Sequence, residues 1–177
     1  MLKLWSNIRH RYTYKTTHPK EAAVLVLFDE SFQRILFTLR SSGVSHANEI
    51  SFPGGVRDSN DKSLADTCKR ETLEETGIDN FTLIAEMDSL PNKTALIRVT
   101  PFIGISHSEF GPDFHPGNKE VEKVFSLPIQ NFQSPIGHRS LLQTSRRSPI
   151  YESHLPTKVW GLTALILEDF FENHWKK

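Results

Sequence analysis

Short apolar runs bounded by polar residues predict a series of β-strands along the chain. Residues 22–28 (AAVLVLF) and 34–40 (RILFTLR) are rich in strand-favouring residues, and the polar stretch DESFQ between them predicts a hairpin. Further strands are expected at residues 81–86, 94–105 and 121–127. Helical patterns interrupt this series, so the chain is expected to form one mixed α/β domain.

Helical spacing appears after Ser63 and again over residues 161–175. Ser63 followed by Asp66 resembles a capping box, and Gly77 suits a C-cap, so a helix is expected between these caps. Cys68 lies on the apolar side of this helix and is expected to pack in the core. Residues 161–175 carry apolar positions at helical intervals and predict a second helix.

The segments between these elements include one turn and two long connections. Gly54 and Gly55 follow Phe52-Pro53 and predict a turn, because glycine relieves the steric limits on the backbone. Residues 106–119 and 130–157 are expected to be loops. Loops of that length in a compact domain tend to be either functional or disordered.

Composition narrows the class of protein. With 177 residues, 37% hydrophobic and 24% charged, the chain fits a single domain over residues 1–177. Lys plus Arg and Asp plus Glu each number 21, so no global basic field favours nucleic acid or an anionic membrane. The longest apolar run is residues 22–28, far short of the roughly 20 residues that cross a bilayer. One cysteine excludes an internal disulfide and fits a reducing intracellular compartment.

Residues 1–20 contain several basic residues and no acid. We expect a basic N-terminal arm or short helix packed on the domain, with a mitochondrial presequence as the alternative. The expected location is therefore the cytoplasm, or alternatively the mitochondrion.

Three glutamates on the first predicted helix share one face. Glu71, Glu74 and Glu75 stand at i, i+3 and i+4, within an arc of about 100°. Like charges repel, so the cluster indicates either a site for a hard cation such as Mg²⁺ or Mn²⁺ or a solvated acidic face with an Arg–Glu pair. Arg70 is close enough to orient one of the carboxylates. We expect this cluster to lie on the surface, without a role in packing.

The region around the cluster resembles the Nudix hydrolases, whose box reads G-x(5)-E-x(7)-R-E-U-x-E-E-x-G-U, with U an aliphatic residue. Residues 55–78 read GVRDSNDKSLADTCKRETLEETGI. The box here is one residue longer before Arg70, Asp61 replaces the first glutamate and Thr72 replaces an aliphatic residue.

The longer box and the aspartate resemble the branch of the family that cleaves coenzyme A and its thioesters. Further similar segments are FTLRSS, SFPGG, VTPFIG, EVEKVFSLPI and VWGLTA, which together span most of residues 22–168. The upstream signature of that branch also expects an arginine and a glycine. Here Ser45 and Asn48 stand nearest those places.

The resemblance implies an α/β/α sandwich with a mixed sheet, a loop-helix-loop catalytic motif and hydrolysis of a pyrophosphate bond with Mg²⁺ or Mn²⁺. The implied metal ligands are Glu71 and Glu75, with Glu74 next as a ligand or as part of the proton path. Arg70 is an implied catalytic residue, and the backbone at Gly54 and Gly55 is implied to approach the phosphates.

A carboxylate outside the box often completes such a site. Glu120 matches that position, but Glu122 would share its face on an extended strand, so the sequence does not separate the two.

Arg40 is a candidate for contact with the 3′-phosphate of a coenzyme A-like substrate, and the pair Arg146-Arg147 is a weaker one. Phe102, Phe125 and Trp160 are expected in the core rather than under an adenine. No histidine is assigned a catalytic role, namely none of His46, His107, His115, His138 and His154.

Three functions are compatible with these residues. The first is a coenzyme A or acyl-coenzyme A diphosphatase, releasing 3′,5′-ADP and 4′-phosphopantetheine. The second keeps the chemistry but uses ADP-ribose, a dinucleotide or another nucleoside diphosphate derivative. The third is a binding module without catalysis, which the presence of all three glutamates disfavours. In each case the expected partner is a small nucleotide, with no nucleic acid or membrane, and the protein is expected to be a monomer or homodimer.

Overall fold

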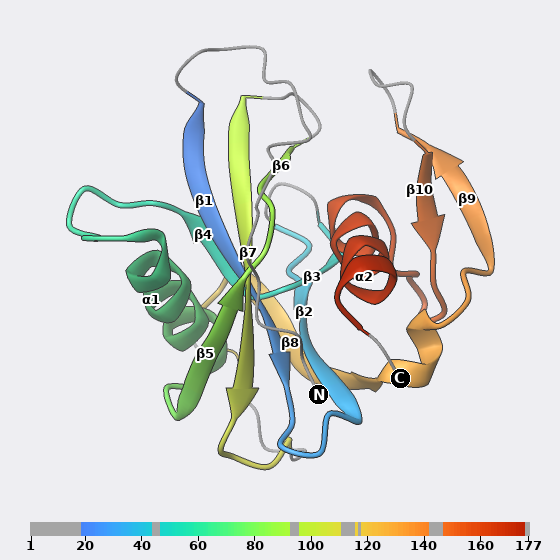
Figure 1. Ribbon diagram of the computed structural model, residues 1–177, viewed down its shortest axis with the longest axis horizontal. Coiled ribbons are helices and arrows are strands. Elements are labelled where there is room, and N and C mark those ends of the chain that lie inside the picture. Colours follow the sequence, from blue (N-terminus) through green and yellow to red (C-terminus); the bar gives the residue numbers. More distant parts are fainter. Residues whose placement is uncertain are drawn as a thin grey trace.

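The computed structural model describes residues 19–43, 47–92, 96–110, 116, 118–141 and 147–175. Strands and helices follow one another along these segments (Figure 1). They are β1 Lys20–Phe28, β2 Arg34–Arg40, β3 Ile50–Ser51, β4 Gly54–Val56, α1 Leu64–Thr76, β5 Phe81–Glu86, β6 Leu90–Pro91, β7 Ile97–Ser106, β8 Val121–Pro128, the 3₁₀ helix η1 Ile129–Phe132, β9 Gly137–Ser140, β10 Arg147–Ile150 and α2 Gly161–Asn173.

The main sheet is mixed and is built around β1. Along one edge, β1 pairs in parallel with β7 over its whole length. The other edge is divided, because β2 pairs with β1 at Phe28 while β4 pairs with it at residues 22–24, both antiparallel. The path through the sheet is β3-β2-β1-β7-β5, with β8 on β2 and β6 on β7. The short strand β4, which contains two glycines, therefore pairs directly with the first half of β1.

A helix covers each face of the sheet, with α1 on one side and α2 on the other (Figure 1). Side chains alternate along β1, so Leu25 belongs to the same core cluster as Cys68 of α1. Val26 and Phe28 belong to the opposite cluster, with Leu167 of α2. The expected α/β/α sandwich is confirmed, as is the packing of Cys68, whose thiol is fully buried.

The predicted turn at the two glycines is instead a strand. Gly54 has φ of 148°. A Cβ there would lie 2.2 Å from the carbonyl oxygen of Ala23. Glycine is depleted in strands, which is why the sequence pattern favoured a turn. Close approach of β4 to β1 requires glycine at this place.

The predicted loop over residues 130–157 is also wrong, since it contains η1 and the antiparallel pair β9–β10. This hairpin packs outside α2, on the right in Figure 1. The buried Ser148 hydroxyl ties it to α2, accepting a hydrogen bond from the Gly161 amide at 2.8 Å. The hairpin is held in place by contact with α2, a helix later in the chain, and the local sequence pattern alone did not predict it.

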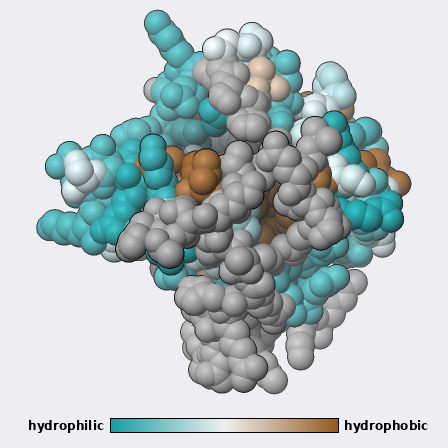
Figure 2. Space-filling view, turned by 90° about the horizontal axis from the view of Figure 1, so that it is seen from above, coloured by the Kyte–Doolittle hydropathy of each residue, from teal (hydrophilic) through white to brown (hydrophobic). Residues whose placement is uncertain are grey.

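Seen from above, hydrophilic residues cover much of the surface at the left margin, on the side of α1 (Figure 2). In the part of the chain that the structure describes, no helix is long and apolar enough to cross a membrane. The expected N-terminal arm falls almost entirely on residues 1–18, which lie outside the described residues.

Candidate active site

Helix α1 begins and ends where its capping residues predict. The Ser63 side chain accepts a hydrogen bond from the Asp66 amide, which satisfies one of the open donors of the first turn. At the other end Gly77 has φ of 72° and donates its amide to the Leu73 carbonyl. The caps fix which residues belong to the helix and therefore which face carries the glutamates.

Strand β4 lies directly against two of those glutamates. The Gly54 amide donates a hydrogen bond to Glu75 Oε2 at 3.0 Å. A Cβ placed on Gly55 would lie 2.5 Å from Cδ of Glu71 and 2.6 Å from both of its carboxylate oxygens. The two glycines thus allow the backbone of β4 to approach the two carboxylates closely.

Glu75 is buried, with only 4% of its surface exposed. This burial raises its pKa to about 7, against the opposing effect of the Gly54 hydrogen bond. The charge of Glu71 raises the pKa of Glu75 further, Arg40 lowers it and Glu120 raises it again. The expectation that the cluster lies on the surface is therefore wrong for Glu75, because β4 covers it.

Glu71 is less buried than Glu75 but has a similar environment. Burial raises the pKa of Glu71, the Arg70 guanidinium opposes that effect, and Glu74 and Glu120 add repulsion. Glu74 is about half exposed. The helix face is therefore divided, with Glu71 and Glu75 turned toward β4 and Glu74 toward solvent.

Arg70 connects the helix glutamates to the loop before the helix. Its Nη1 donates to Glu71 Oε1 at 2.9 Å and to Glu74 Oε2 at 3.2 Å. Its Nε and Nη2 donate to the two oxygens of Asp61, at 3.0 and 2.9 Å. A bidentate pair of this kind fixes the plane of the guanidinium, so Asp61 determines where Arg70 holds Glu71.

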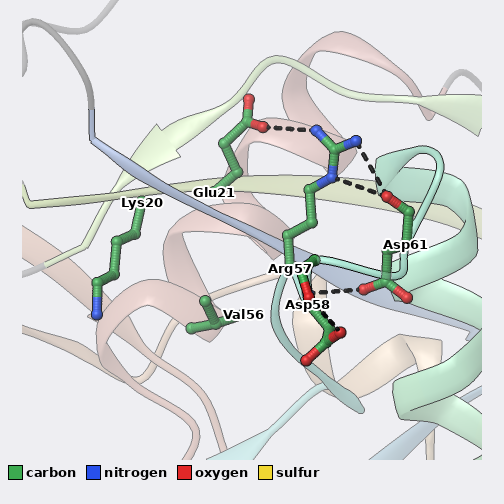
Figure 3. A pocket seen from close by; sticks show the side chains of 7 residues that line it. Lys20, Glu21, Val56, Arg57, Asp58 and Asp61 are labelled. Atoms are coloured by element: carbon green, nitrogen blue, oxygen red, sulfur yellow. Dashed lines mark hydrogen bonds and ion pairs between the residues drawn. The ribbon is translucent and has the colours of Figure 1, made fainter.

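A second arginine, Arg57, holds the loop that carries Asp61 (Figure 3). Its guanidinium donates to the backbone carbonyls of Asp61 and Lys62 and to the Glu21 carboxylate. The Asp58 amide in turn donates to Asp61 Oδ2 at 2.9 Å. A shallow pocket of about 460 Å³ lies over this network. It is lined by Lys20, Glu21, Val56, Arg57, Asp58, Ser59 and Asp61.

Asp61→Asn should make the free energy of unfolding depend less on pH in the acid range. The Arg70 guanidinium, the Asp58 amide and the Thr67 hydroxyl hold the pKa of Asp61 well below its ordinary value of 3.8. A lowered pKa stabilises the fold above that ordinary value, and this contribution is lost as the pH falls below it. Urea unfolding at pH 7 should therefore show a less stable variant, and the difference should shrink below about pH 4.

Asp58→Asn removes a carboxylate from the same loop without touching Arg70, and serves as the matched control. A difference between wild type and Asp61→Asn that stayed constant from pH 7 to pH 3 would contradict the electrostatic role of Asp61.

Two further charged side chains come from Arg40, the last residue of β2, and Glu120, the residue just before β8. Arg40 Nη2 lies 3.5 Å from Glu120 Oε2. Glu120 contributes to the pKa of both Glu71 and Glu75. The structure therefore brings Glu120 toward the cluster.

Other residues considered from the sequence lie elsewhere or outside the described segments. His107 contacts Glu30 and Thr82. Trp160 is half-buried beneath the Arg139 guanidinium, which lies 4.3 Å from its ring centre. Phe102 is buried in the cluster on the α1 side of the sheet, and Phe125 packs against the cluster on the α2 side, so both contribute to the core as expected. Arg147 is exposed on β10, and Ser45, His46, His115 and Arg146 lie outside the described residues.

Sequence reasoning did not assign a role to Asp61, Arg57 or Thr67, although all three hold the site together. Asp61 alone had a signal, since it occupies the position of the first glutamate of the box. Arg57 and Thr67 act through backbone carbonyls and a buried hydroxyl, so no spacing rule singles them out.

The acidic side chains of the site offer oxygen donors of the kind that a divalent cation binds. No three His, Cys, Asp or Glu side chains in the described segments already converge on a common point. Negative charge is nevertheless concentrated here, because Glu120 raises the pKa of both Glu71 and Glu75, and Glu71 also raises that of Glu75. Crowded carboxylate oxygens are the donors that Mg²⁺ and Mn²⁺ prefer. The residues therefore fit such a cation.

The geometry agrees with the family assignment from sequence comparison. A model of the NUDIX domain matches residues 17–144, and the chain therefore belongs to the Nudix hydrolase family. The chain is 36% identical over 168 residues to Nudix hydrolase 15, mitochondrial, of Arabidopsis thaliana, covering 84% of this chain and 56% of that protein. The chain thus spans little more than half the length of that relative.

Two further relatives match over more of their own length. An uncharacterized Nudix hydrolase NudL of Photorhabdus laumondii is 33% identical over 159 residues, covering 84% of this chain and 81% of that protein. The human mitochondrial coenzyme A diphosphatase NUDT8 is 31% identical over 172 residues, covering 85% of this chain and 67% of that protein.

Solved structures agree on the fold. A MutT/nudix family protein from Enterococcus faecalis has a TM-score of 0.55 at 19% identity, covering 92% of this chain and 64% of that chain. A NUDIX hydrolase from Nitrosomonas europaea has a TM-score of 0.54 at 20% identity, covering 68% and 63%. At these identities the similarity concerns the fold alone.

Proposed function

We propose that the protein is a divalent-cation-dependent pyrophosphohydrolase that cleaves coenzyme A or acyl-coenzyme A into 3′,5′-ADP and 4′-phosphopantetheine. One observation carries the proposed chemistry: the carboxylates of Glu71 and Glu75 are held against the backbone of Gly54 and Gly55, beside Glu120. A pyrophosphate could approach the backbone here closely, since neither glycine carries a Cβ.

Glu71, Glu75 and Glu120 are the residues that would hold Mg²⁺ or Mn²⁺. When bound, such a cation neutralises the pyrophosphate and lowers the pKa of a coordinated water. Neighbouring groups of the protein hold these carboxylates in place. The Gly54 amide orients Glu75, and Arg70 orients Glu71. Glu74, half exposed and paired with Arg70, is positioned to accept a proton at the edge of the site.

Three features favour coenzyme A as the substrate. The box is one residue longer than the family pattern and carries Asp61, as in the coenzyme A branch. The human relative is named a coenzyme A diphosphatase. Third, Asn48 has φ of 59°. That branch has a glycine near this place, and asparagine is among the few other residues that adopt the left-handed region readily.

The test is a substrate panel. Coenzyme A, acetyl-coenzyme A, ADP-ribose, NADH and diadenosine polyphosphates would each be incubated with Mg²⁺ or Mn²⁺, and the products separated by chromatography. The proposal expects 3′,5′-ADP and 4′-phosphopantetheine, with the highest kcat/KM on coenzyme A or its thioester. Faster cleavage of ADP-ribose or a dinucleotide would support the alternative substrate class, and no cleavage of any compound would support a binding module.

We also propose an intracellular location, in the cytoplasm or alternatively in the mitochondrion. Two of the relatives are named as mitochondrial proteins. Imaging of the tagged full chain against markers of both compartments would distinguish these locations.

A further inference from the structure

The ends of β2 and β8 meet beside the helix carboxylates. The Ser41 amide donates a hydrogen bond to the Glu120 carbonyl at 2.9 Å, which joins the two strand ends through the backbone. The Arg40 side chain pairs with the Glu120 side chain at 3.5 Å. Arg40 also donates its own amide to the Glu49 carbonyl at 3.1 Å, so its backbone is fixed on both sides.

A β-bulge determines which glutamate Arg40 meets. Leu39 pairs with Lys123, but Arg40 pairs with Val121, so one residue of β8 is left out of the ladder. In an unbroken antiparallel register Arg40 would lie opposite Glu122. Bulges often redirect side chains next to active sites. Here the bulge brings the guanidinium to Glu120.

The Arg40–Glu120 pair lies within electrostatic reach of the buried carboxylate. Burial is the main cause of the raised pKa of Glu75, but Arg40 and Glu120 both act on it, with opposite signs. The guanidinium therefore neutralises part of the same negative charge that a divalent cation would neutralise.

We propose that Arg40 and the divalent cation compete for Glu120, so that cation binding releases the Arg40 guanidinium to the pyrophosphate oxygens of the substrate. This inference rests on the proposed function. The Glu120 side chain is 61% exposed, and ion pairs that reach solvent are weak. Arginine is suited to the second role because its planar fork binds phosphate oxygens in pairs.

The position of Arg40 also bears on substrate choice. Arg40 pairs with Glu120 and acts electrostatically on Glu75, so it lies near the place where the pyrophosphate would be held, whereas a 3′-phosphate is distant from the bond that breaks. Under this inference Arg40 serves any pyrophosphate substrate equally, and the 3′-phosphate contact predicted from the sequence belongs to another group.

The first arm of the test measures binding of Mn²⁺ alone by calorimetry. Arg40→Ala should bind Mn²⁺ about three- to tenfold more tightly than wild type, because a competing positive charge is removed. Glu120→Gln should bind it more weakly. Arg34→Ala is the matched control, since Arg34 lies on the same strand about 20 Å away and contacts Ser126. Its Mn²⁺ affinity should equal that of wild type.

The second arm measures kinetics on coenzyme A and on 3′-dephospho-coenzyme A. Arg40→Ala should raise KM by the same factor, about tenfold, on both substrates. A selective loss on coenzyme A would overturn the inference, as would unchanged or weaker Mn²⁺ binding. If Arg40→Ala fails to fold, Arg40→Gln provides the same comparison with a polar side chain. Failure of the wild type to bind Mn²⁺ would instead overturn the proposed function.

Discussion

Glu75→Gln is expected to lower kcat by about 10²–10⁴-fold at saturating Mg²⁺ or Mn²⁺, while the protein stays folded. The glutamine keeps an oxygen that can accept the Gly54 amide, so the contact between β4 and α1 survives. It removes the negative charge that a cation or a transferred proton requires. Steady-state kinetics on the best substrate of the panel would measure the loss. A variant with wild-type kcat would show that Glu75 has no part in the chemistry.

The same substitution should stabilise the protein at alkaline pH when divalent cations are removed with EDTA. The pKa of Glu75 is about 7 in the fold, against an ordinary value of 4.5. The folded state therefore holds the proton more tightly than the unfolded chain does, and stability is lost as the pH rises from 4.5 through 7. Glutamine avoids this loss, so the variant should gain about 1–3 kcal/mol at pH 8.

The gain should shrink toward zero near pH 4, where the glutamate is protonated in both states. Urea unfolding at pH 4, 6 and 8 would measure it. Glu74→Gln is the matched control for stability, because Glu74 is half exposed and pairs with Arg70. It should show no such gain. A less stable Glu75→Gln at pH 8 would mean that the buried charge is compensated in the fold.

Gly55→Ala is expected to reduce kcat/KM by about 10²-fold with little change in stability. The atoms nearest to the new Cβ would be the end of the Glu71 side chain, with both carboxylate oxygens at 2.6 Å. A flexible side chain can turn away, so the fold should persist while the carboxylate leaves its place. Thermal unfolding and kinetics on the same sample would separate the two effects.

Gly54→Ala provides the contrast. Its Cβ would meet backbone atoms of β1, at 2.2 Å from the Ala23 oxygen and 2.6 Å from the Val24 Cα, and its φ of 148° already disfavours alanine. The melting temperature should fall by about 10 °C or more. If the two variants lost activity and stability to the same extent, the expected distinction between a clash with a side chain and a clash with the backbone would be wrong.

The helix of the site could be predicted closely because its determinants are local. Ser63 and Gly77 specify its ends, and the i, i+3, i+4 spacing places the glutamates on one face. Burial of Glu75 could not be predicted in the same way. It arises because β4 pairs with a strand some thirty residues earlier in the chain, and periodicity within one helix carries no information about that contact.

The same distinction applies to the partner carboxylate. From side-chain alternation alone, Glu120 and Glu122 were equally good candidates for the carboxylate outside the box, since both would lie on one face of a regular strand. The bulge between Leu39 and Arg40 decided between them. A register shift depends on how two strands fit each other, so it is absent from the pattern of either strand alone.

The loop held by Arg57 shows how the family pattern tolerates a change in length. It has one residue more than the pattern, and its acidic residue is one methylene shorter, yet both oxygens of Asp61 still reach Arg70. The longer backbone and the shorter side chain offset each other at the same guanidinium. In this chain the length of the loop and the length of the Asp61 side chain together set where the Arg70 guanidinium lies, and with it the carboxylate of Glu71.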